Sequence, residues 1–451
     1  MGRAQVMQAE AAGIEPSVLM NPILLKPTND VGSQVIVNGE VLATMRAMDY
    51  FKYKKTLIPD IMKAYHTLEE QSDIIVIEGA GSPAEINLKS DDIVNMGMAK
   101  MAKSPVLLVG DIDRGGVFAQ LAGTMMLLEE EEKQLVKGLI INKFRGDKTI
   151  LDPGIVMLEE LCHRSVVGVT PYMDIDVEDE DSLSERMSNE KAVGQIDLVV
   201  VRLPRISNFT DFDALAYEPD VAVRFVKPGD AIGEPDMVIL PGSKNTMADL
   251  KYLEDRGYAE DIKALAKKGV PVFGVCGGYQ MLGEKLHDPD GVEGDIPELN
   301  GLGLLPTETT MTGTKMTHQV SFNTTKLPFL GIDYSGENLR GYEIHMGDTH
   351  GVGTVADCFA ITSRSEKPVA VMDGFVNESG LVMGTYIHGI LDNDSLRRQI
   401  LNALRKRKGL EPLDEVFHYF EHKDAAYNRL ADIVEKHLDM DYIDKLLEEQ
   451  A

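Results

Sequence analysis

The chain has 451 residues, enough for two or three domains with well-filled cores, and its 43% hydrophobic and 26% charged residues are typical of a globular protein. A formal net charge of −28 disfavours nucleic acid and anionic membranes as partners, and an anionic substrate would need local positive charge or a metal at its site. The sequence contains neither an apolar run of about 20 residues nor the apolar core of a signal peptide. Its three cysteines are widely spaced, which argues against a disulfide framework and against a zinc site and favours the cytoplasm.

Four apolar runs near the N-terminus predict the strands of a parallel sheet. Near-continuous Val, Ile and Leu without period-two alternation is typical of strands buried on both faces. Helical stretches such as AQLAGTMMLLEEEEKQL lie between them, so residues 1–175 are predicted to form an α/β domain. The runs are DIIVIEGAG (73–81), SPVLLVGDIDRGG (104–116), VKGLIINKFRGD (136–147) and SVVGVTPYM (165–173).

An acidic stretch without clear periodicity follows, and we interpret residues 176–194 as a linker, with a surface loop inside one domain as the alternative. The strand pattern then restarts, so residues 195–400 are predicted to form a second α/β domain. Residues 401–451 are predicted to be a helical extension whose last 20 residues have the apolar spacing of a docking helix. The second set of runs is QIDLVVVRLP (195–204), DMVILPGSKNT (236–246), GVPVFGVCGGYQ (269–280) and GLVMGTYIHG (380–389).

The segment around Cys276 predicts a nucleophile at a sharp turn between a buried strand and a helix. Glycines surround this cysteine, and they permit the strained dihedrals and close backbone approach of such a turn. A thiol at a helix N-terminus is favoured as thiolate, and the N–H groups that follow it, such as that of Gly277, can stabilise an oxyanion. A small buried cysteine packed beside glycines is the structural alternative.

A cysteine nucleophile needs a base, and three residues are candidates from the sequence. His388 follows an apolar strand, while Glu343 and His345 lie in RGYEIHMGD. Gly242 and Ser243, in LPGSKNT, could complete the oxyanion hole, or they could form an ordinary turn.

Nine strings along the chain resemble the cobyric acid synthase family in their order. ISNFTDFDAL, LPGSKNT, GVCGGYQMLG, RGYEIHMG and GTYIHG resemble its glutaminase domain, and EGAGSPAEINL, DDIVNMGMA, GDIDRGGVFA and INKFRGD resemble its synthetase domain. The resemblance implies a dethiobiotin-synthetase-like, P-loop-NTPase-like domain followed by a flavodoxin-like class I glutamine amidotransferase domain. It also implies ATP- and glutamine-dependent amidation of the b, d, e and g carboxylates of adenosylcobyrinic a,c-diamide, a corrinoid.

The resemblance assigns Cys276 as the nucleophile and His388 as its base. Many relatives in the wider superfamily have a Glu two residues after this histidine, but Ile390 occupies that position here, so we expect a Cys–His dyad. Glu343 remains an alternative orienting group.

In the synthetase half, the resemblance implies that ATP converts a substrate carboxylate into an acyl phosphate, which ammonia then attacks. Glu78, at the end of a predicted strand, matches a Mg²⁺ ligand of the related fold. Asp92 and Asp111, with Asp113 nearby, could face the metal or the acyl phosphate, or could cap helices. Asn142 resembles a base-reading position.

A P-loop, G-x-x-x-x-G-K-[ST], does not occur in the sequence, although the family has one ahead of the segment matching MGRAQVMQAEAAG. We expect either that the start codon was chosen downstream of the true one, or that the chain is truncated and its ATP chemistry is impaired. Three other functions stay open: cobyrinic acid a,c-diamide synthase, a lipid II amidotransferase, or a non-catalytic corrinoid-binding relative.

Overall fold

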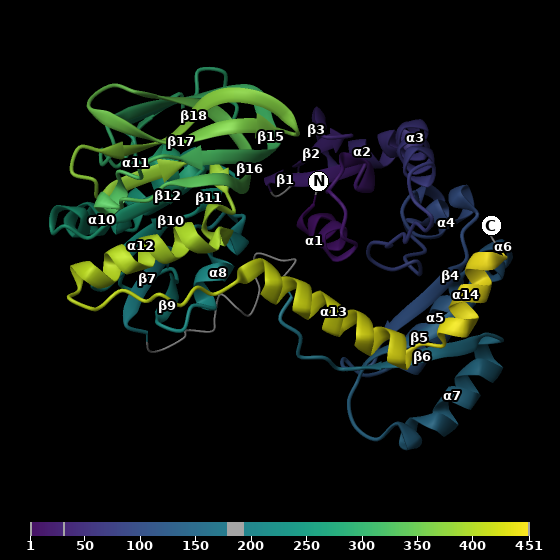
Figure 1. Cartoon of the computed structure of the whole chain (residues 1–451). Helices are drawn as coiled ribbons and strands as arrows, with labels where there is room; N and C mark the ends of the chain where they lie inside the picture. Colours follow the sequence, from purple (N-terminus) through teal and green to yellow (C-terminus); the bar gives the residue numbers. More distant parts are fainter. Residues whose placement is uncertain (1, 30–31, 178–193, 450–451) are drawn as a thin grey trace. The chain divides into compact units, whose positions relative to one another are not determined.

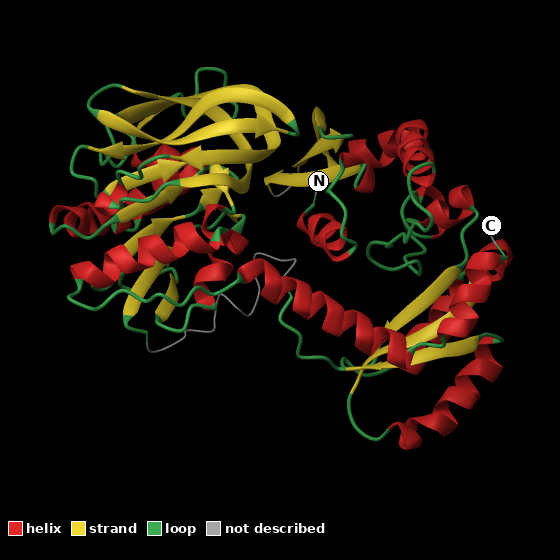
Figure 2. Cartoon of the chain, in the orientation of Figure 1, coloured by secondary structure: helices red, strands yellow, loops and turns green. Residues whose placement is uncertain are grey.

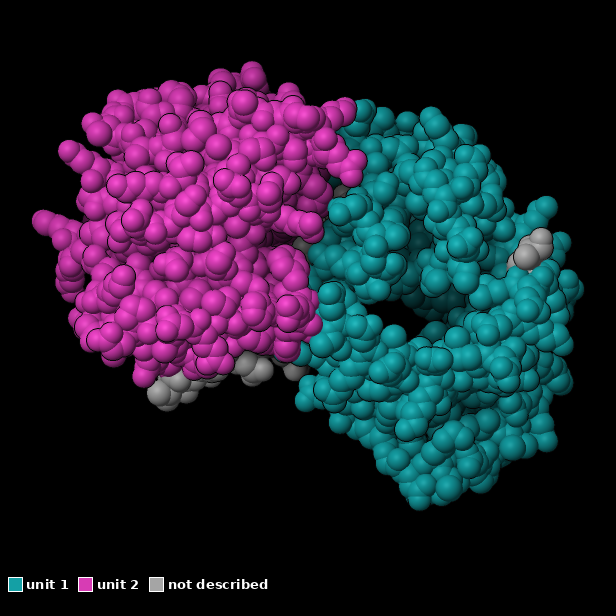
Figure 3. All heavy atoms as spheres, viewed as in Figure 1, with its two compact units in different colours: residues 1–177, 423–451 teal, residues 178–422 magenta. Residues whose placement is uncertain are grey.

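The computed structural model describes residues 2–29, 32–177 and 194–449. The chain divides into two compact units, which we call unit 1 (residues 1–177 and 423–451) and unit 2 (residues 178–422) (Figure 3). The second boundary falls inside helix α13 (Tyr419–His437), so the C-terminal segment is shared between the units and is not a separate extension. Most of the predicted linker, residues 178–193, lies outside the described residues.

Unit 1 contains a parallel sheet of three strands in the order β4-β5-β6 (Figure 1). Apolar residues of β5 and of helices α5 and α7 form its core. The predicted single helical run over 119–135 is two helices, α5 and α6, because Glu129 caps the second helix with a capping box. The bounds are β4 Val106–Asp111, β5 Val136–Phe144, β6 Ser165–Pro171, α4 Met96–Ala102, α5 Val117–Leu127, α6 Glu130–Leu135 and α7 Lys148–Cys162.

The predicted strand over residues 73–81 is wrong for this structure. The segment is irregular coil, and the side chains of Ile74 and Val76 are 57% and 89% exposed. A parallel strand requires a hydrogen-bonding neighbour, and within the described residues β4 pairs with β5 alone. The apolar sequence of residues 73–81 therefore predicted a strand, but no strand of the described residues pairs with this segment.

The rest of unit 1 comes from both ends of the chain. An antiparallel sheet, β1-β2-β3, precedes helix α2, the 3-10 helix η2 and helix α3. At the other end, α13 and α14 are separated at Leu438–Asp439, where the Asp439 N–H donates to the Val167 carbonyl at 2.8 Å. The Tyr442 hydroxyl donates to the Lys137 carbonyl at 2.8 Å, so the C-terminal helices dock on β5 and β6. The bounds are α1 Arg3–Ala11, η1 Val18–Met20, β1 Ile23–Asn29, β2 Gly32–Val37, β3 Glu40–Arg46, α2 Ala47–Tyr53, η2 Lys54–Leu57, α3 Ile58–Glu69, η3 Lys89–Asp91 and α14 Met440–Glu448.

Unit 2 is built on a parallel sheet in the order β9-β7-β10-β12-β19, with helices on both faces (Figure 2). Successive residues of β7 alternate between two hydrophobic clusters, which explains the near-continuous apolar sequence of this strand. Helices α9 and α10 contribute to one cluster and α12 to the other. The bounds are β7 Ile196–Val201, β9 Val221–Val226, β10 Met237–Leu240, β12 Val272–Val275, β19 Val382–Thr385, α8 Asp213–Ala216, α9 Thr246–Asp255, α10 Tyr258–Lys267, α11 Gly277–Leu282 and α12 Asp394–Arg407.

Further strands, which the sequence did not predict, extend this sheet beyond β19, and the long strands β15 to β18 among them pair in antiparallel fashion. One of them, β16, also pairs with the two-residue strand β20, Ile387–His388, and places Tyr342 opposite His388. The extension therefore holds the predicted base in a fixed register. Its bounds are β13 Lys285–His287, β14 Glu298–Asn300, β15 Thr307–Thr324, β16 Gly336–Gly351, β17 Val355–Arg364 and β18 Lys367–Asn377. No helix among residues 2–29, 32–177 and 194–449 is long and apolar enough to cross a membrane.

Candidate active site

Cys276 occupies the turn between β12 and α11, where the sequence predicted a strained elbow. Its backbone has φ 53° and ψ −111°, a conformation that L-residues with side chains rarely adopt. Such a residue costs on the order of 1–3 kcal/mol, so the surrounding fold must hold it in place. The Cys276 N–H donates to the Thr385 carbonyl at 2.8 Å, and the thiol contacts the Ile344 carbonyl at 3.6 Å.

His388 lies beside this thiol and is completely buried. Its Nδ1 is 2.7 Å from an Asp211 carboxylate oxygen, and the other Asp211 oxygen accepts the Gly389 N–H at 3.0 Å. Asp211 belongs to the 3-10 helix η5, Phe209–Phe212, which follows β8, Ile206–Ser207. Since Asp211 occupies Nδ1, the Nε2 atom of His388 remains for Cys276, and the expected dyad is instead a Cys–His–Asp arrangement.

The charge of this arrangement favours a protonated imidazole. Burial alone would lower the pKa of His388, but Asp211 and the hydrogen bond and charge of Cys276 outweigh burial and raise this pKa to about 10. An imidazolium between a thiolate and a carboxylate is an ion-pair form in which a cysteine is ready to attack.

Two further side chains contact the imidazole. The Asn208 side-chain amide is 3.2 Å from His388 Nε2, on the same nitrogen that serves the thiol. The Tyr342 ring stacks on the imidazole with centroids 5.0 Å apart and planes 15° apart. These contacts fix the plane of the ring, so proton transfer needs no reorientation of the base.

Two glycines lie close to His388 and to the turn that carries Cys276. A Cβ atom on Gly242, in β11 (Gly242–Ser243), would lie 2.9 Å from Ser207 Oγ and 3.3 Å from His388 Cε1. A Cβ on Gly277 would lie 2.9 Å from the Ser243 nitrogen. As the first residue of α11, Gly277 has an N–H group without an intrahelical acceptor. A side chain at either glycine would therefore collide with a neighbouring residue: Ser207 at Gly242, and Ser243 at Gly277.

A buried acid holds the turn that carries Gly242. Asp249, which is fully buried, accepts the Ser243 hydroxyl at 2.7 Å and the Arg205 backbone N–H at 3.2 Å. Burial raises its pKa, although the bonds from Ser243 and Arg205 oppose that rise.

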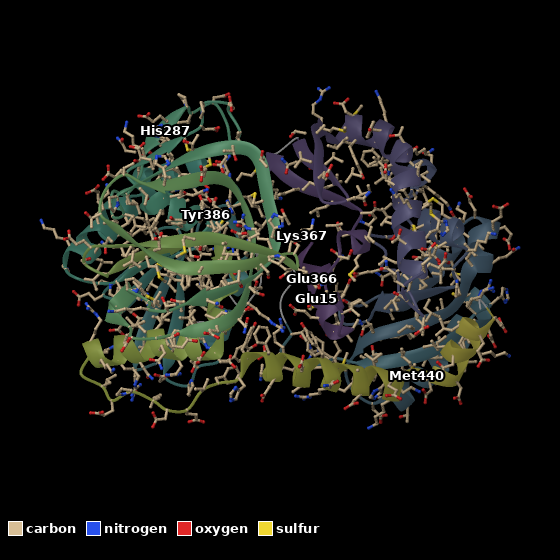
Figure 4. The ribbon with its side chains drawn as sticks, turned by 45° about the horizontal axis from the view of Figure 1, so that its top comes forward. Glu15, His287, Glu366, Lys367, Tyr386 and Met440 are labelled. Carbon is tan, nitrogen blue, oxygen red and sulfur yellow. The ribbon has the colours of Figure 1, made fainter. Side chains whose placement is uncertain are left out.

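The other predicted base candidates point elsewhere. Glu343 makes two hydrogen bonds to the Arg364 guanidinium, at 2.7 and 2.8 Å, and faces Ile387 across the β16–β20 pair. His345 stacks on Tyr386, with ring centroids 3.8 Å apart. Tyr386 lies at the junction of β19 and β20 inside unit 2 (Figure 4). Neither Glu343 nor His345 occupies the place of a base or an orienting group for Cys276.

In unit 1, Asp111 and Asn142 lie side by side at the carboxyl ends of β4 and β5. The Lys143 ammonium donates to Asp111 at 3.0 Å and holds the pKa of that carboxyl below its usual value. Asn142 accepts the Thr170 hydroxyl and the Lys143 N–H through its side-chain oxygen. Asp113, the neighbouring acid, pairs with Arg145 at 2.7 Å.

Asp92 and Glu78 have different surroundings. Asp92 accepts the N–H groups of Val94, Asn95 and Gly97, and these bonds outweigh partial burial and lower its pKa. It therefore caps the turn into α4, one of the two roles that the sequence allowed. Glu78 is exposed and accepts the Gln8 side-chain amide at 2.7 Å. No group of three His, Cys, Asp or Glu side chains in the described parts of the chain could enclose a metal ion.

Three residues of the candidate site were not predicted from the sequence: Asp211, Asn208 and Tyr342. The first two lie in ISNFTDFDAL and the third in RGYEIHMG, strings that we matched to a family without assigning their polar residues. The available signal was an Asn and an Asp that each directly precede a phenylalanine, because polar groups buried beside aromatic residues require partners.

Comparison with known proteins covers both units. A CobB/CobQ-like glutamine amidotransferase domain matches residues 197–396, and an AAA domain matches residues 41–179. A cobyric acid synthase of Lachnoclostridium phytofermentans is 53% identical over 100% of this chain and 89% of its own length. That of Caldanaerobacter subterraneus is 49% identical over 99% of this chain and 88% of its own length. That of Ruminiclostridium cellulolyticum is 52% identical over 100% of this chain and 87% of its own length. The chain belongs to the cobyric acid synthase family.

Proposed function

We propose that Cys276 releases ammonia from glutamine in unit 2, and that unit 1 uses it to amidate the b, d, e and g carboxylates of adenosylcobyrinic a,c-diamide. As a member of its family, the chain is an ATP- and glutamine-dependent amidotransferase of cobalamin biosynthesis, with glutamine and a corrinoid as substrates. What we add are the residues that perform each step.

Attack on glutamine begins with the thiol of Cys276. In the ion pair its proton already lies on Nε2 of His388, and the sulfur, as a thiolate, adds to the carbonyl carbon of the glutamine side chain. Asp211 keeps the Nδ1 proton in place and stabilises the imidazolium that forms, which is the function of the acid in a catalytic triad. The carbonyl oxygen becomes an oxyanion, which accepts hydrogen bonds from the Gly242 and Gly277 N–H groups.

Ammonia leaves when the carbon–nitrogen bond breaks and the imidazolium returns its proton to the departing nitrogen. A thioester with Cys276 remains. Water then loses a proton to His388 and attacks the thioester, which releases glutamate and restores the thiol. One glutamine and one water therefore give one glutamate and one ammonia, with no net change in the site.

In unit 1, the acceptor carboxylate is converted by ATP to an acyl phosphate, and ammonia displaces the phosphate to give the amide. We assign Asp111 and Asn142 to this site because parallel strands present their ligand-binding groups at their carboxyl ends. We also propose that Asp92, which caps the turn into α4, faces the acyl phosphate in this site.

Mg²⁺ fits Glu78 as a single protein ligand, because this ion usually takes one or two carboxylates and completes its shell with phosphate oxygens and water. The exposed Glu78 carboxylate, with one neutral donor, suits that role. When bound, the ion would offset the negative charge of the nucleotide phosphates.

The observation that carries the proposal is the hydrogen bond between Asp211 and His388, whose imidazole lies beside Cys276. The test compares Cys276→Ser with Cys358→Ser, since Cys358 is a second buried cysteine of unit 2. We expect the first substitution to abolish amidation supported by glutamine and to spare amidation supported by ammonium salts. The second should spare both. Full glutamine-dependent activity in Cys276→Ser would remove the assignment of the nucleophile.

A further inference from the structure

Asp373 is a buried acid of unit 2 that the glutaminase mechanism above does not use. It lies in β18, is only 7% exposed, and forms no ion pair with a Lys, Arg or His of the described residues. The buried acids Glu343 and Asp249 each contact an arginine instead. Burial raises the pKa of Asp373 to about 6, although hydrogen bonds from its neighbours oppose that rise. Burying a carboxylate without a cation destabilises a fold, which sets Asp373 apart from an ordinary core residue.

The backbone of β18 brings this carboxylate to the end of β19. The antiparallel pairing of the two strands ends beside Gly374, which has φ 75°. A Cβ atom on Gly374 would lie 2.8 Å from the Gly384 carbonyl. Glycine adopts this conformation without a steric penalty and leaves room for the close approach. Asp373 thereby reaches Thr385 and Tyr386, at the junction between β19 and β20.

Two residues at this junction donate hydrogen bonds to Asp373. The Thr385 hydroxyl donates to one carboxylate oxygen, and the Tyr386 N–H donates to the other at 3.1 Å. Because the hydroxyl proton points to Asp373, a lone pair of the same hydroxyl oxygen accepts the Ile387 N–H at 3.0 Å. A carboxylate makes stronger hydrogen bonds than a neutral acceptor, so it fixes this hydroxyl in one orientation.

The junction that Asp373 holds contacts both the nucleophile and the base. The Thr385 carbonyl accepts the Cys276 N–H at 2.8 Å, at the strained elbow. Ile387, whose N–H is bound by the Thr385 hydroxyl, directly precedes His388. A shift of Thr385 would therefore move the thiol and the imidazole relative to each other. A misplacement of about 1 Å can cost about 100-fold in rate.

We propose that Asp373 is a positioning residue of the glutaminase reaction, which sets the geometry between Cys276 and His388 through Thr385. This inference rests on the roles proposed above for Cys276 and His388. Asp373 makes no hydrogen bond to either residue in the described structure. We therefore expect it to affect kcat for glutamine hydrolysis and to leave KM for glutamine unchanged.

The experiment compares Asp373→Asn with Asp357→Asn in the full chain, with glutamate release from glutamine as the assay. Asp357 is the matched control, because it is an exposed acid of the adjacent strand β17 and, like Asp373, acts by charge on Cys358. An amide in place of the Asp373 carboxylate cannot accept from both junction donors, since its NH₂ group faces one of them. Asp373→Asn should lower kcat about 10- to 100-fold with KM within about twofold, and Asp357→Asn should change neither.

Two substitutions of Thr385 separate positioning from folding. Thr385→Val keeps the shape of the side chain and removes its hydroxyl, whereas Thr385→Ser keeps the hydroxyl. We expect kcat to fall about 10- to 100-fold in Thr385→Val and to be largely retained in Thr385→Ser. The double variant of Asp373→Asn and Thr385→Val should lose about as much as either single variant, because both substitutions break the same contact.

Full kcat in Asp373→Asn, an equal loss in Asp357→Asn, or losses that multiply in the double variant would overturn the inference. Equal losses in Thr385→Ser and Thr385→Val would do the same. If thermal unfolding showed that Asp373→Asn does not fold, the two Thr385 variants would decide alone. Cys276→Ser, assayed in parallel, keeps the two proposals apart, since glutamate release by that variant would remove the proposed nucleophile instead.

Discussion

Replacing Asp211 with Asn exchanges one oxygen for an NH₂ group at the far end of the hydrogen-bond chain from Cys276. In the structure, one carboxylate oxygen accepts the Gly389 N–H at 3.0 Å and the other is 2.7 Å from His388 Nδ1. An Asn amide can accept on one side only. If its oxygen stays on Gly389, its NH₂ group faces Nδ1 and forces the imidazole proton onto Nε2, where it blocks proton transfer from the thiol.

The opposite amide orientation is also costly. It would place the NH₂ group against the Gly389 N–H and leave a buried donor without a partner, at a cost of about 1–3 kcal/mol. Loss of the carboxylate also removes the main attraction that raises the pKa of His388 to about 10. We therefore expect kcat for glutamine hydrolysis to fall by about 10²–10⁴-fold, and the alkaline limb of its pH profile to move from near pH 10 towards neutral pH.

Glutamate release from glutamine measures this effect directly, and ammonia-dependent amidation controls for damage elsewhere in the chain. Glu343→Gln is the matched control, because Glu343 is a buried acid near the site that binds Arg364 and not His388. Retention of a tenth or more of the activity by Asp211→Asn, or an equal loss in Glu343→Gln, would refute the assignment of Asp211.

Three further predictions concern the same unit. Gly242→Ala would place a methyl group 2.9 Å from Ser207 Oγ and 3.3 Å from His388 Cε1, so glutaminase kcat should fall about 10- to 100-fold in steady-state assays with little change in Tm. Glu218→Ala would remove one of the two carboxylates from each of the buried guanidinium groups of Arg397 and Arg398, which keep Asp394 and Asp220, and urea unfolding should show a loss of about 3 kcal/mol; a loss below 1 kcal/mol would contradict this. Because the pKa of His388 is higher in the folded chain than the ordinary 6.5, its proton stabilises the fold below pH 6.5 and this contribution is lost as pH rises to about 10. Stability measured across that range should fall with pH, and Asp211→Asn should flatten the slope.

The sequence predicted the buried parallel strands and the residues that follow them. The run before Cys276 is strand β12, which is buried throughout as such a run predicts, and the run up to Asp111 is strand β4, which is only partly buried, with Val109 55% exposed. The long strands β15 and β16 were not predicted, because they are rich in Thr and charged residues and contain no continuous apolar run. Much of β15 does alternate between buried and half-exposed positions, so a search for period two could have found part of it.

The position of Asp211 was beyond the reach of local patterns. It lies 177 residues before His388, and η5 has only four residues, so no periodicity marks it. The superfamily spacing led instead to Ile390, which is buried in the hydrophobic core. The strand predicted over residues 73–81 was wrong for a different reason. Its residues favour a strand locally, but a strand also needs a neighbouring strand to pair with.

The return of the last 29 residues to unit 1 has a consequence for how this protein is made. The hydrogen bond between Asp439 and Val167 joins a strand to a helix that is synthesised well after it. A ribosome adding roughly 5–20 residues per second needs on the order of tens of seconds to translate residues 178–422 in between. During that interval the β5–β6 surface lacks its covering helices, so unit 1 can complete its fold only after residues 178–422 have been made.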